Sequence, residues 1–179
     1  MITILWAGSI IVAFYLGRHG KLRRKPAALK AGLKNVLKRF VIFAPIITLL
    51  TWAFLPDNIF SFPRERPQQW LMVMMLYPLL SVWPQEIAYR AFLYHRYAPL
   101  FGTGSGYVIA SALLFGFMHI IFLNPVAVIM TTIGGYLFAS DYARHKSLTL
   151  ACIEHALYGS LIFTLGLGLY FYSNAAWGL

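Results

Sequence analysis

Apolar residues fall into long, nearly unbroken runs along this chain, and short polar stretches separate the runs. The apolar runs cover residues 2–16, 40–55, 70–97, 107–123, 126–140 and 148–172. A helix needs roughly 20 residues to cross the hydrocarbon of a bilayer, and it satisfies its own backbone hydrogen bonds there. The pattern therefore predicts an all-α fold, a polytopic transmembrane helix bundle of about six helices.

The polar stretch between the first two runs, residues 21–39, has a helical pattern of its own. Apolar residues recur there at helical spacing, and lysines alternate with them. The apolar residues are Leu29, Leu33, Val36 and Leu37, and the lysines are Lys30, Lys34 and Lys38. Two interpretations fit this pattern: a helix that lies on the inner membrane surface, or the cytoplasmic end of the next span.

Two prolines, Pro78 and Pro84, interrupt the third run. A proline removes a backbone donor and kinks a helix, and inside a membrane the freed carbonyls must find partners. We therefore expect kinks that face protein or water. Gln85, Glu86 and Arg90 follow directly after the second proline, so polar side chains enter the bundle at this point.

The composition supports lipid as the solvent of this chain. Of its 179 residues, 60% are hydrophobic and 11% are charged, whereas soluble domains have about 25% charged residues. The single cysteine, Cys152, excludes an intramolecular disulfide and a cysteine-based zinc site, and we expect it to pack in the core. No positive stretch precedes the first run, so we expect that run to be an uncleaved anchor.

The net charge of +10 is concentrated in loops. Nine of the fifteen Lys and Arg residues lie within residues 18–39, which indicates a cytoplasmic loop near anionic lipid rather than nucleic-acid binding. The positive loops at 18–39, 96–106 and 141–147 would face the cytoplasm, and the loop at 56–67 and both termini would face outward. We expect an integral, multi-pass protein of a bacterial inner membrane, with the lipid bilayer and no nucleic acid as partner.

Three of the five acids, Glu86, Asp141 and Glu154, lie in apolar runs or at their ends. A charge at the centre of a bilayer costs about 2.5–3.5 kcal/mol on insertion scales, so each acid is a candidate functional residue. Glu86 and Arg90 are spaced i,i+4, which places them on one helix face. That spacing also suits a purely structural ion pair.

The other two acids have basic neighbours in the loop between the last two runs. We expect Asp141 and Arg144 to form a solvated loop pair. Glu154 is expected either to orient a site residue or to pair with Arg144 or Lys146.

Two histidines, His119 and His155, lie in two further apolar runs. A lone histidine in such a helix is often only a hydrogen-bonded packing residue. Two histidines on different helices, with Glu86 on a third, are natural partners because each needs a polar contact. We therefore expect these three side chains to meet in a central polar cavity of the bundle.

Two chemistries suit that set of side chains. In the first, a carboxylate and one histidine polarise a water for attack on a carbonyl, while the other histidine stabilises the oxyanion. In the second, Glu86, His119 and His155 bind a divalent metal as a two-histidine, one-carboxylate set. The His-Glu-x-x-His signature of zinc proteases is absent from the sequence, so we expect no cofactor and keep a divalent metal as the alternative.

Three short motifs in these runs follow one another in a recognisable order. They read Gln85-Glu86-Ile87-Ala88-Tyr89-Arg90, then Phe115-Gly116-Phe117-Met118-His119, then His155-Ala156-Leu157-Tyr158-Gly159. They resemble the motifs of the CPBP family, the CAAX-processing and bacteriocin-processing intramembrane proteases related to the Rce1-type prenyl protease. That family's pattern is Glu-Glu-x-x-x-Arg, Phe-x-x-x-His and His-x-x-x-Asn or Asp on separate membrane helices. The resemblance covers roughly residues 70–172.

The resemblance implies a glutamic-type intramembrane endopeptidase without an obligatory metal. Carried over from the family, His119 would orient the attacking water and His155 would stabilise the oxyanion. Arg90 would hold the region around Glu86 in place.

The chain departs from the family pattern at two positions. Gln85 stands where the family has its proposed general base, and an amide cannot accept a proton at neutral pH. Gly159 stands where the family has an Asn donor. Either Glu86 has taken over as base, with Tyr158, Gln85 or backbone filling the gap at Gly159, or the chain has lost proteolysis.

The leading hypothesis is therefore an enzyme that hydrolyses peptide bonds of membrane-associated or lipidated proteins, with water activated through Glu86 and His119. The alternative is a catalytically silent relative that acts as a membrane scaffold, chaperone or bacteriocin-immunity factor. A small transporter is a third hypothesis. In each case we expect one integrated membrane domain, with anchor helices and a basic loop in residues 1–66 and the catalytic-type bundle in residues 67–179.

Overall fold

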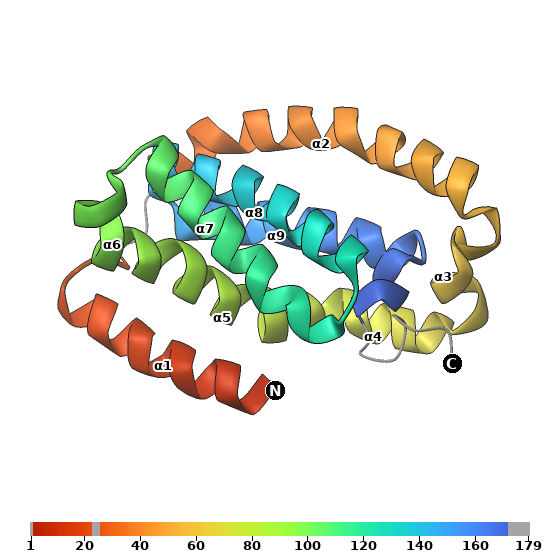
Figure 1. The fold of residues 1–179 in the computed structure, drawn as a ribbon, viewed down its shortest axis with the longest axis horizontal. Coiled ribbons are helices and arrows are strands. Elements are labelled where there is room, and N and C mark those ends of the chain that lie inside the picture. Colours follow the sequence, from red (N-terminus) through yellow and green to blue (C-terminus); the bar gives the residue numbers. More distant parts are fainter. Residues whose placement is uncertain (1, 23–25, 172–179) are drawn as a thin grey trace.

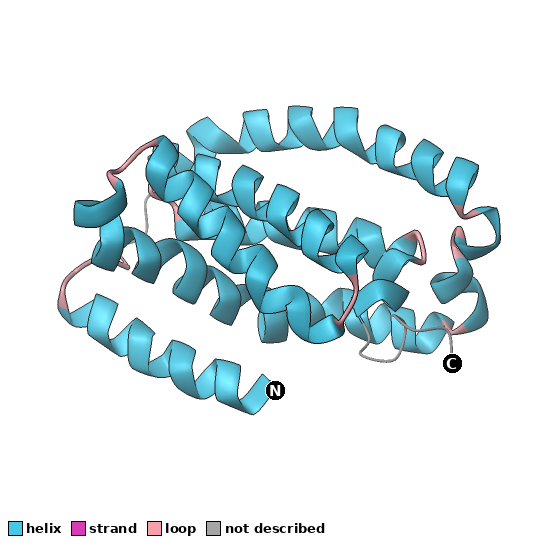
Figure 2. Ribbon diagram, viewed as in Figure 1, coloured by secondary structure: helices cyan, strands magenta, loops and turns pink. Residues whose placement is uncertain are grey.

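The computed structural model describes residues 2–22 and 26–171, and short loops join helices throughout those ranges (Figures 1 and 2). The α-helices are α1 (Ile2–Arg18), α2 (Pro26–Phe54), α3 (Ser61–Glu65), α4 (Pro67–Tyr77), α5 (Trp83–Glu86), α6 (Leu93–Phe101), α7 (Ser105–Met118), α8 (Pro125–His145) and α9 (Leu148–Thr164). The 3-10 segments are η1 (Pro56–Asn58), η4 (His119–Phe122) and η5 (Leu167–Phe171). The described residues contain no strand, which confirms the predicted all-α bundle.

Within residues 2–22 and 26–171, four helical segments are long and apolar enough to cross a membrane. They are Pro26–Phe54, Pro67–Phe101, Ser105–Phe122 and Pro125–His145. Helices α1 and α9 are shorter and also apolar. The outward faces of the spans carry large exposed hydrophobic side chains, such as Leu113, Ile129 and Ile133, which suits contact with lipid. The chain is therefore an integral, multi-pass membrane protein of about six membrane helices, as predicted.

Helix α2 runs without a break from Pro26 to Phe54, so the basic stretch is the first part of the second span. The interpretation as a separate surface helix is wrong. Gly32 and Val36 are buried, and Gly32 packs against side chains of Leu150 and His145. This stretch therefore packs against the bundle by one face, which a helix lying on the bilayer would not do.

The third span is one helical segment of 35 residues that contains α4, α5 and α6. Two π-helical segments, η2 (Pro78–Val82) and η3 (Ile87–Phe92), join its three parts. The predicted proline kinks thus take the form of widened turns, which make room for a proline ring against the preceding turn. Both π segments flank α5, and π-turns often mark functional sites.

Helices α7 and α8 pack closely because small residues lie between them. A side chain at Gly116 would overlap Thr132, and one at Gly135 would press against Ala112 and Phe115. Helix α2 lies along one side of the bundle next to α8 and α9, and α1 lies along the opposite side next to α5 and η3 (Figure 1).

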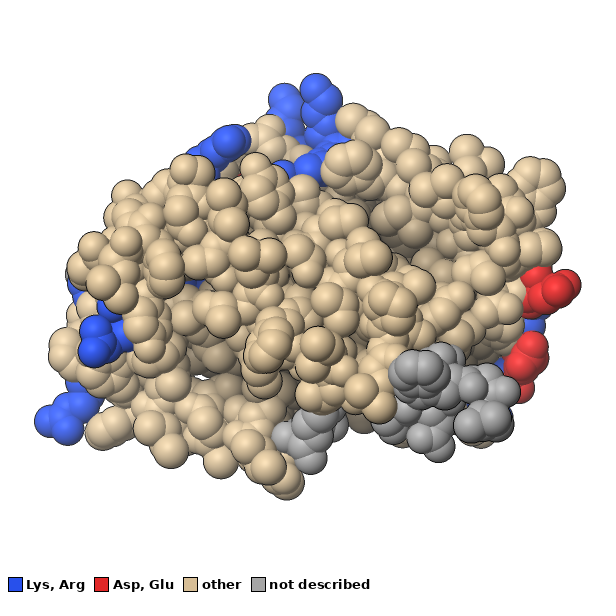
Figure 3. Space-filling view, in the orientation of Figure 1, with Lys and Arg blue, Asp and Glu red and all other residues tan. Residues whose placement is uncertain are grey.

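The two ends of the bundle differ in charge. The end of α1, the beginning of α2, the α6–α7 loop and the α8–α9 loop lie at one end (Figure 1). Lys and Arg side chains gather at this end and along α2, and acidic side chains gather at the other end (Figure 3). The exposed acids Asp57 and Glu65 belong to η1 and α3 at that other end. This grouping agrees with the loop sets inferred from charge, and the assignment of the basic end to the cytoplasm stays a prediction.

Candidate functional site

Glu86 is the last residue of α5 and is fully buried between the two π segments. Its Oε1 lies 2.8 Å from Nδ1 of His155, and its Oε2 lies 3.1 Å from Nε of Arg90. An ionised carboxylate can only accept hydrogen bonds, so with Glu86 ionised the N–H group at Nδ1 of His155 is the donor of this hydrogen bond. One buried carboxylate therefore joins an arginine on its own helix to a histidine on α9.

Arg90 is fully buried in η3 and forms the predicted i,i+4 ion pair with Glu86. The angle at Nε does not suit a hydrogen bond, so the attraction between opposite charges holds the two side chains together. The guanidinium carbon lies 4.4 Å from the centre of the Phe115 ring and 5.3 Å from that of Phe138. These cation–π contacts help to stabilise a charge that is otherwise surrounded by apolar side chains.

The imidazole of His155 is enclosed by three aromatic rings. It stacks on Phe138 with ring centres 4.8 Å apart, and it meets Phe115 and Tyr77 edge to face at 5.4 Å and 6.0 Å. The rings and the bond to Glu86 fix the imidazole plane. Among the described residues no group forms a hydrogen bond with Nε2 of His155, so this nitrogen is free to act on a substrate or water.

His119 lies outside this direct pairing. It is the first residue of η4, and its Nδ1 lies 2.7 Å from the carbonyl oxygen of Phe115 in the preceding turn. Its ring centre is 4.7 Å from that of Phe115. Phe115 thus contacts both imidazoles, and the polar contacts of the described residues do not link His119 to Glu86 or His155.

The metal alternative requires Glu86, His119 and His155 as one ligand set. Within residues 2–22 and 26–171, no three His, Cys, Asp or Glu side chains are arranged to hold a metal ion. Glu86 pairs with His155, whereas His119 pairs with the carbonyl oxygen of Phe115 on its own helix. The expectation of a metal-free site stays a prediction.

Gln85 is half-buried next to Glu86. Its Nε2 donates to Oγ of Ser81 at 2.7 Å, and its Oε1 is buried without a hydrogen-bond partner among the described residues. A buried carbonyl oxygen of this kind is commonly satisfied by water or by a ligand. Gln85 can therefore hold a water near Glu86 as a hydrogen-bond acceptor, although it cannot remove the proton.

Tyr77 occupies the space that a side chain at position 159 would need. A Cβ added to Gly159 would overlap the hydroxyl oxygen and ring carbons of Tyr77. The ring of Tyr77 also faces His155, as described above. Tyr158, Gln85 or backbone were expected to fill this gap, and Tyr77 was not predicted. The absence of a side chain at Gly159 was the only signal, and it cannot indicate which distant residue fills the space.

A second group of buried charges lies between α2, α8 and α9. Nη2 of Arg39 lies 2.6 Å from Oδ2 of Asp141 and also donates to Oε1 of Glu154. The predicted solvated pair of Asp141 with Arg144 is therefore wrong, as is the pairing of Glu154 with Arg144 or Lys146. Asp141 and Glu154 are both buried, and α2 brings Arg39 against them.

A search with family models finds a match in this chain. The model described as "Type II CAAX prenyl endopeptidase Rce1-like" matches residues 67–161. The match begins with α4 and ends within α9, so it includes Glu86, Arg90 and His155 and excludes Arg39. No curated protein and no solved structure matches this chain.

Proposed function

The chain belongs to the Rce1-like family of type II CAAX prenyl endopeptidases, and from this premise we propose that it hydrolyses peptide bonds of lipidated or membrane-associated proteins. The observation that carries the proposal is the hydrogen bond between Glu86 and His155 in the membrane-embedded bundle. A carboxylate that holds one imidazole nitrogen leaves the other nitrogen in the correct state to accept a proton.

In the proposed reaction, Nε2 of His155 takes a proton from water as the water oxygen attacks the substrate carbonyl carbon. Glu86 fixes the tautomer and stabilises the positive charge that forms on the ring, and Arg90 balances the charge of Glu86. His155 then returns the proton to the leaving nitrogen, the carbon–nitrogen bond breaks, and a carboxylic acid and an amine are released. This assignment differs from the expected one, in which Glu86 was the base and His155 bound the oxyanion.

The hydroxyl group of Tyr77 is the proposed donor to the oxyanion. It lies over Gly159, the position where the family pattern has its Asn, and its ring faces His155. A hydroxyl placed there donates one hydrogen bond to the developing negative charge, as the missing amide would. Gln85 in α5 and His119 in η4 are proposed to orient water and substrate.

The family description supports the proposed substrate class. CAAX prenyl substrates carry a lipid on a cysteine near the C-terminus, so the lipid places the peptide at the membrane. We propose lipidated C-terminal tails as substrates, a metal-free mechanism and a location in a bacterial inner membrane.

The proposal is tested with the purified full chain in lipid nanodiscs and a fluorogenic peptide that carries a prenylated cysteine. We expect cleavage by the unmodified protein and a fall of about 10²–10⁴-fold in Glu86→Gln, because the tautomer of His155 is no longer held. Glu65→Gln removes an exposed acid at the far end of the molecule and should cleave normally. Thermal unfolding of each variant shows whether a loss of cleavage is caused by a loss of folded protein.

Gln85 and Gly159 favour one alternative, a silent relative that acts as a scaffold or immunity factor, because neither residue can supply the family's side-chain chemistry. The same variants distinguish the two functions. A silent protein would cleave none of the lipidated peptides, and its cellular phenotype would survive in folded Glu86→Gln. Loss of both cleavage and phenotype in that variant supports the protease.

A further inference from the structure

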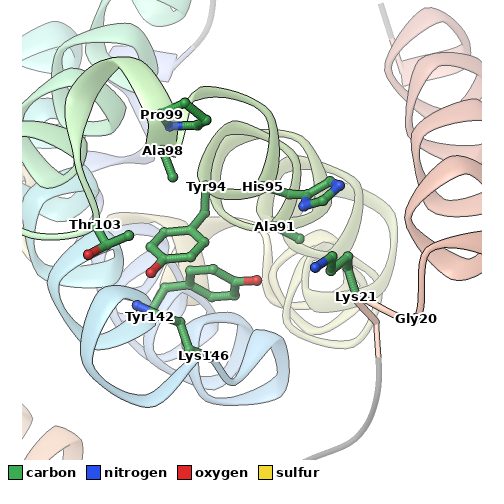
Figure 4. Close-up of a pocket in the computed structure, with 10 residues that line it drawn as sticks. All are labelled: Gly20, Lys21, Ala91, Tyr94, His95, Ala98, Pro99, Thr103, Tyr142 and Lys146. Atoms are coloured by element: carbon green, nitrogen blue, oxygen red, sulfur yellow. The ribbon is translucent and has the colours of Figure 1, made fainter.

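A hollow of about 570 Å³ is lined by residues of several helices (Figure 4), and Glu86 is not among them. The hollow lies between the end of α1, the last turns of α6 and the end of α8. Its volume falls within the range of small-ligand sites. The proposed hydrolysis does not use it.

The polar lining of the hollow is positive. Lys21 follows α1 and Lys146 follows α8, so two segments that are distant in sequence contribute one cationic side chain each, and His95 of α6 adds an imidazole. None of the described lining residues is acidic. The hydroxyl groups of Tyr94, Tyr142 and Thr103 add hydrogen-bond donors to the same wall. This set of donors is suited to an anionic group with several oxygen atoms.

Lys146 is held in place rather than free in solvent. Its Nζ lies 3.8 Å from the centre of the Tyr94 ring and donates to the carbonyl oxygen of Ala143 at the end of α8. The rings of Tyr94 and Tyr142 lie edge to face at 5.7 Å, which fixes the aromatic part of the wall. The hollow therefore presents a partly preorganised positive charge.

Glu86 and His155 do not line the hollow. Ala91 and Tyr142 do line it, and they belong to a buried apolar cluster that also contains Ile87 and Tyr107. The lining therefore argues against a role in binding the scissile part of a substrate.

The surroundings of the hollow match the headgroup region of a membrane. Lys and Arg side chains gather at this end of the molecule (Figure 3), and exposed apolar residues such as Phe14 and Leu100 lie on the neighbouring helices α1 and α6. Basic pockets between membrane helices on the positive side bind the headgroups of anionic lipids, whose acyl chains lie against the adjacent apolar faces. We propose that this hollow binds the phosphate group of an anionic phospholipid, which links α1 to α6 and α8.

Lipid binding is measured on the full chain by native mass spectrometry and by titration with vesicles of phosphatidylglycerol or phosphatidylcholine. We expect selective retention of phosphatidylglycerol. In the double variant Lys21→Gln/Lys146→Gln the affinity should fall about fivefold for each lysine removed. The matched control Lys30→Gln/Lys34→Gln removes the same charge from exposed positions of α2 and should change the affinity less than about twofold.

Because Lys146 also contacts the end of α8, its substitution could affect folding as well as lipid binding. A second variant therefore blocks the hollow without removing a charge. Ala98→Trp fills the hollow and leaves every charge in place, and it should abolish the preference for phosphatidylglycerol while the protein stays folded. Equal binding of the two lipids, or an equal loss in the α2 control, would overturn the proposal. So would inorganic phosphate that binds as tightly as the lipid, because a free anion would then be the ligand. Displacement of lipid by a peptide with a free C-terminal carboxylate, but not by its amide, would reassign the hollow to substrate.

Discussion

Two groups of charged side chains form around buried carboxylates in the part of the chain that the structure describes, and they differ in what these carboxylates contact. Around Glu86, one carboxylate pairs with one arginine and also accepts a hydrogen bond from His155. Around Arg39, one arginine serves two carboxylates, Asp141 and Glu154, without a histidine. Both groups pair charges within the protein rather than leaving them in lipid, but only the first includes an imidazole.

The two groups also differ in their position relative to the residues that match the family, which suggests that one has a catalytic role and the other stabilises the helix bundle. The Arg39 group joins α2 to α8 and α9 and lies partly outside the residues that match the family. The Glu86 group lies wholly inside the matched residues. We infer that the Arg39 group stabilises the bundle and that the Glu86 group performs the reaction, and the following predictions test this division.

The largest effect is expected for His155→Gln, which keeps a polar side chain of similar size but cannot accept a proton. The rate of cleavage of the lipidated peptide should fall about 10²–10⁴-fold, because the variant lacks the proposed base. His19→Gln, an exposed histidine at the end of α1, is the control. If the variant retained more than about a tenth of the activity, the proposed difference between the two groups would be contradicted. The Glu86 group would then have only a structural role, like the Arg39 group.

Arg39→Met should have the next largest effect, on stability. The substitution leaves two buried acids without their cation, which costs about 3–5 kcal/mol when one partner of a buried pair is removed. Denaturant unfolding in detergent measures the loss, and Arg144→Met at an exposed position provides the control. The activity of each folded molecule should be unchanged. A stability loss of less than about 1 kcal/mol would show that the Arg39 group does not hold α2 in place.

Tyr77→Phe sharpens the comparison by removing a single hydroxyl group next to His155. Cleavage should fall about 10²–10³-fold with little change in unfolding, because one donor to the oxyanion is lost while the ring still fills the space over Gly159. Gly159→Asn should be destabilised by overlap with Tyr77, and the double variant Gly159→Asn/Tyr77→Ala should recover part of the activity. Unchanged cleavage by Tyr77→Phe would contradict the proposed donor.

The smallest effect is expected for Gln85→Glu, which restores the family pattern at this position. Cleavage should rise by at most about tenfold, because His155 already supplies a base. The rate is compared with that of Gln85→Met, which has no acceptor and should be slower than the unmodified protein. A fall in rate with Glu at this position would indicate that a second carboxylate disturbs the pairing of Glu86 with His155.

Contacts between residues close together in the sequence could be predicted at this site from the sequence alone. The spacing of Glu86 and Arg90 predicted their ion pair because both lie on one stretch of helix, where side chains four residues apart are neighbours. The pairing of Asp141 with Arg144 rested on proximity along the chain and was wrong, since the partner comes from 102 residues away. Tyr77 was missed because nothing in the sequence relates it to Gly159.

The sequence by itself determined the membrane spans and the candidate set of acids and histidines, because hydrophobic runs and backbone hydrogen bonding act over a few residues and need no distant partner. Only the tertiary structure decided that Glu86 contacts His155, 69 residues away, rather than His119, and that Arg39 neutralises Asp141 and Glu154. Those contacts depend on how far each helix is rotated and on where the π segments widen its turns. Packing between helices sets both quantities, so the spacing of residues along one segment does not reveal them.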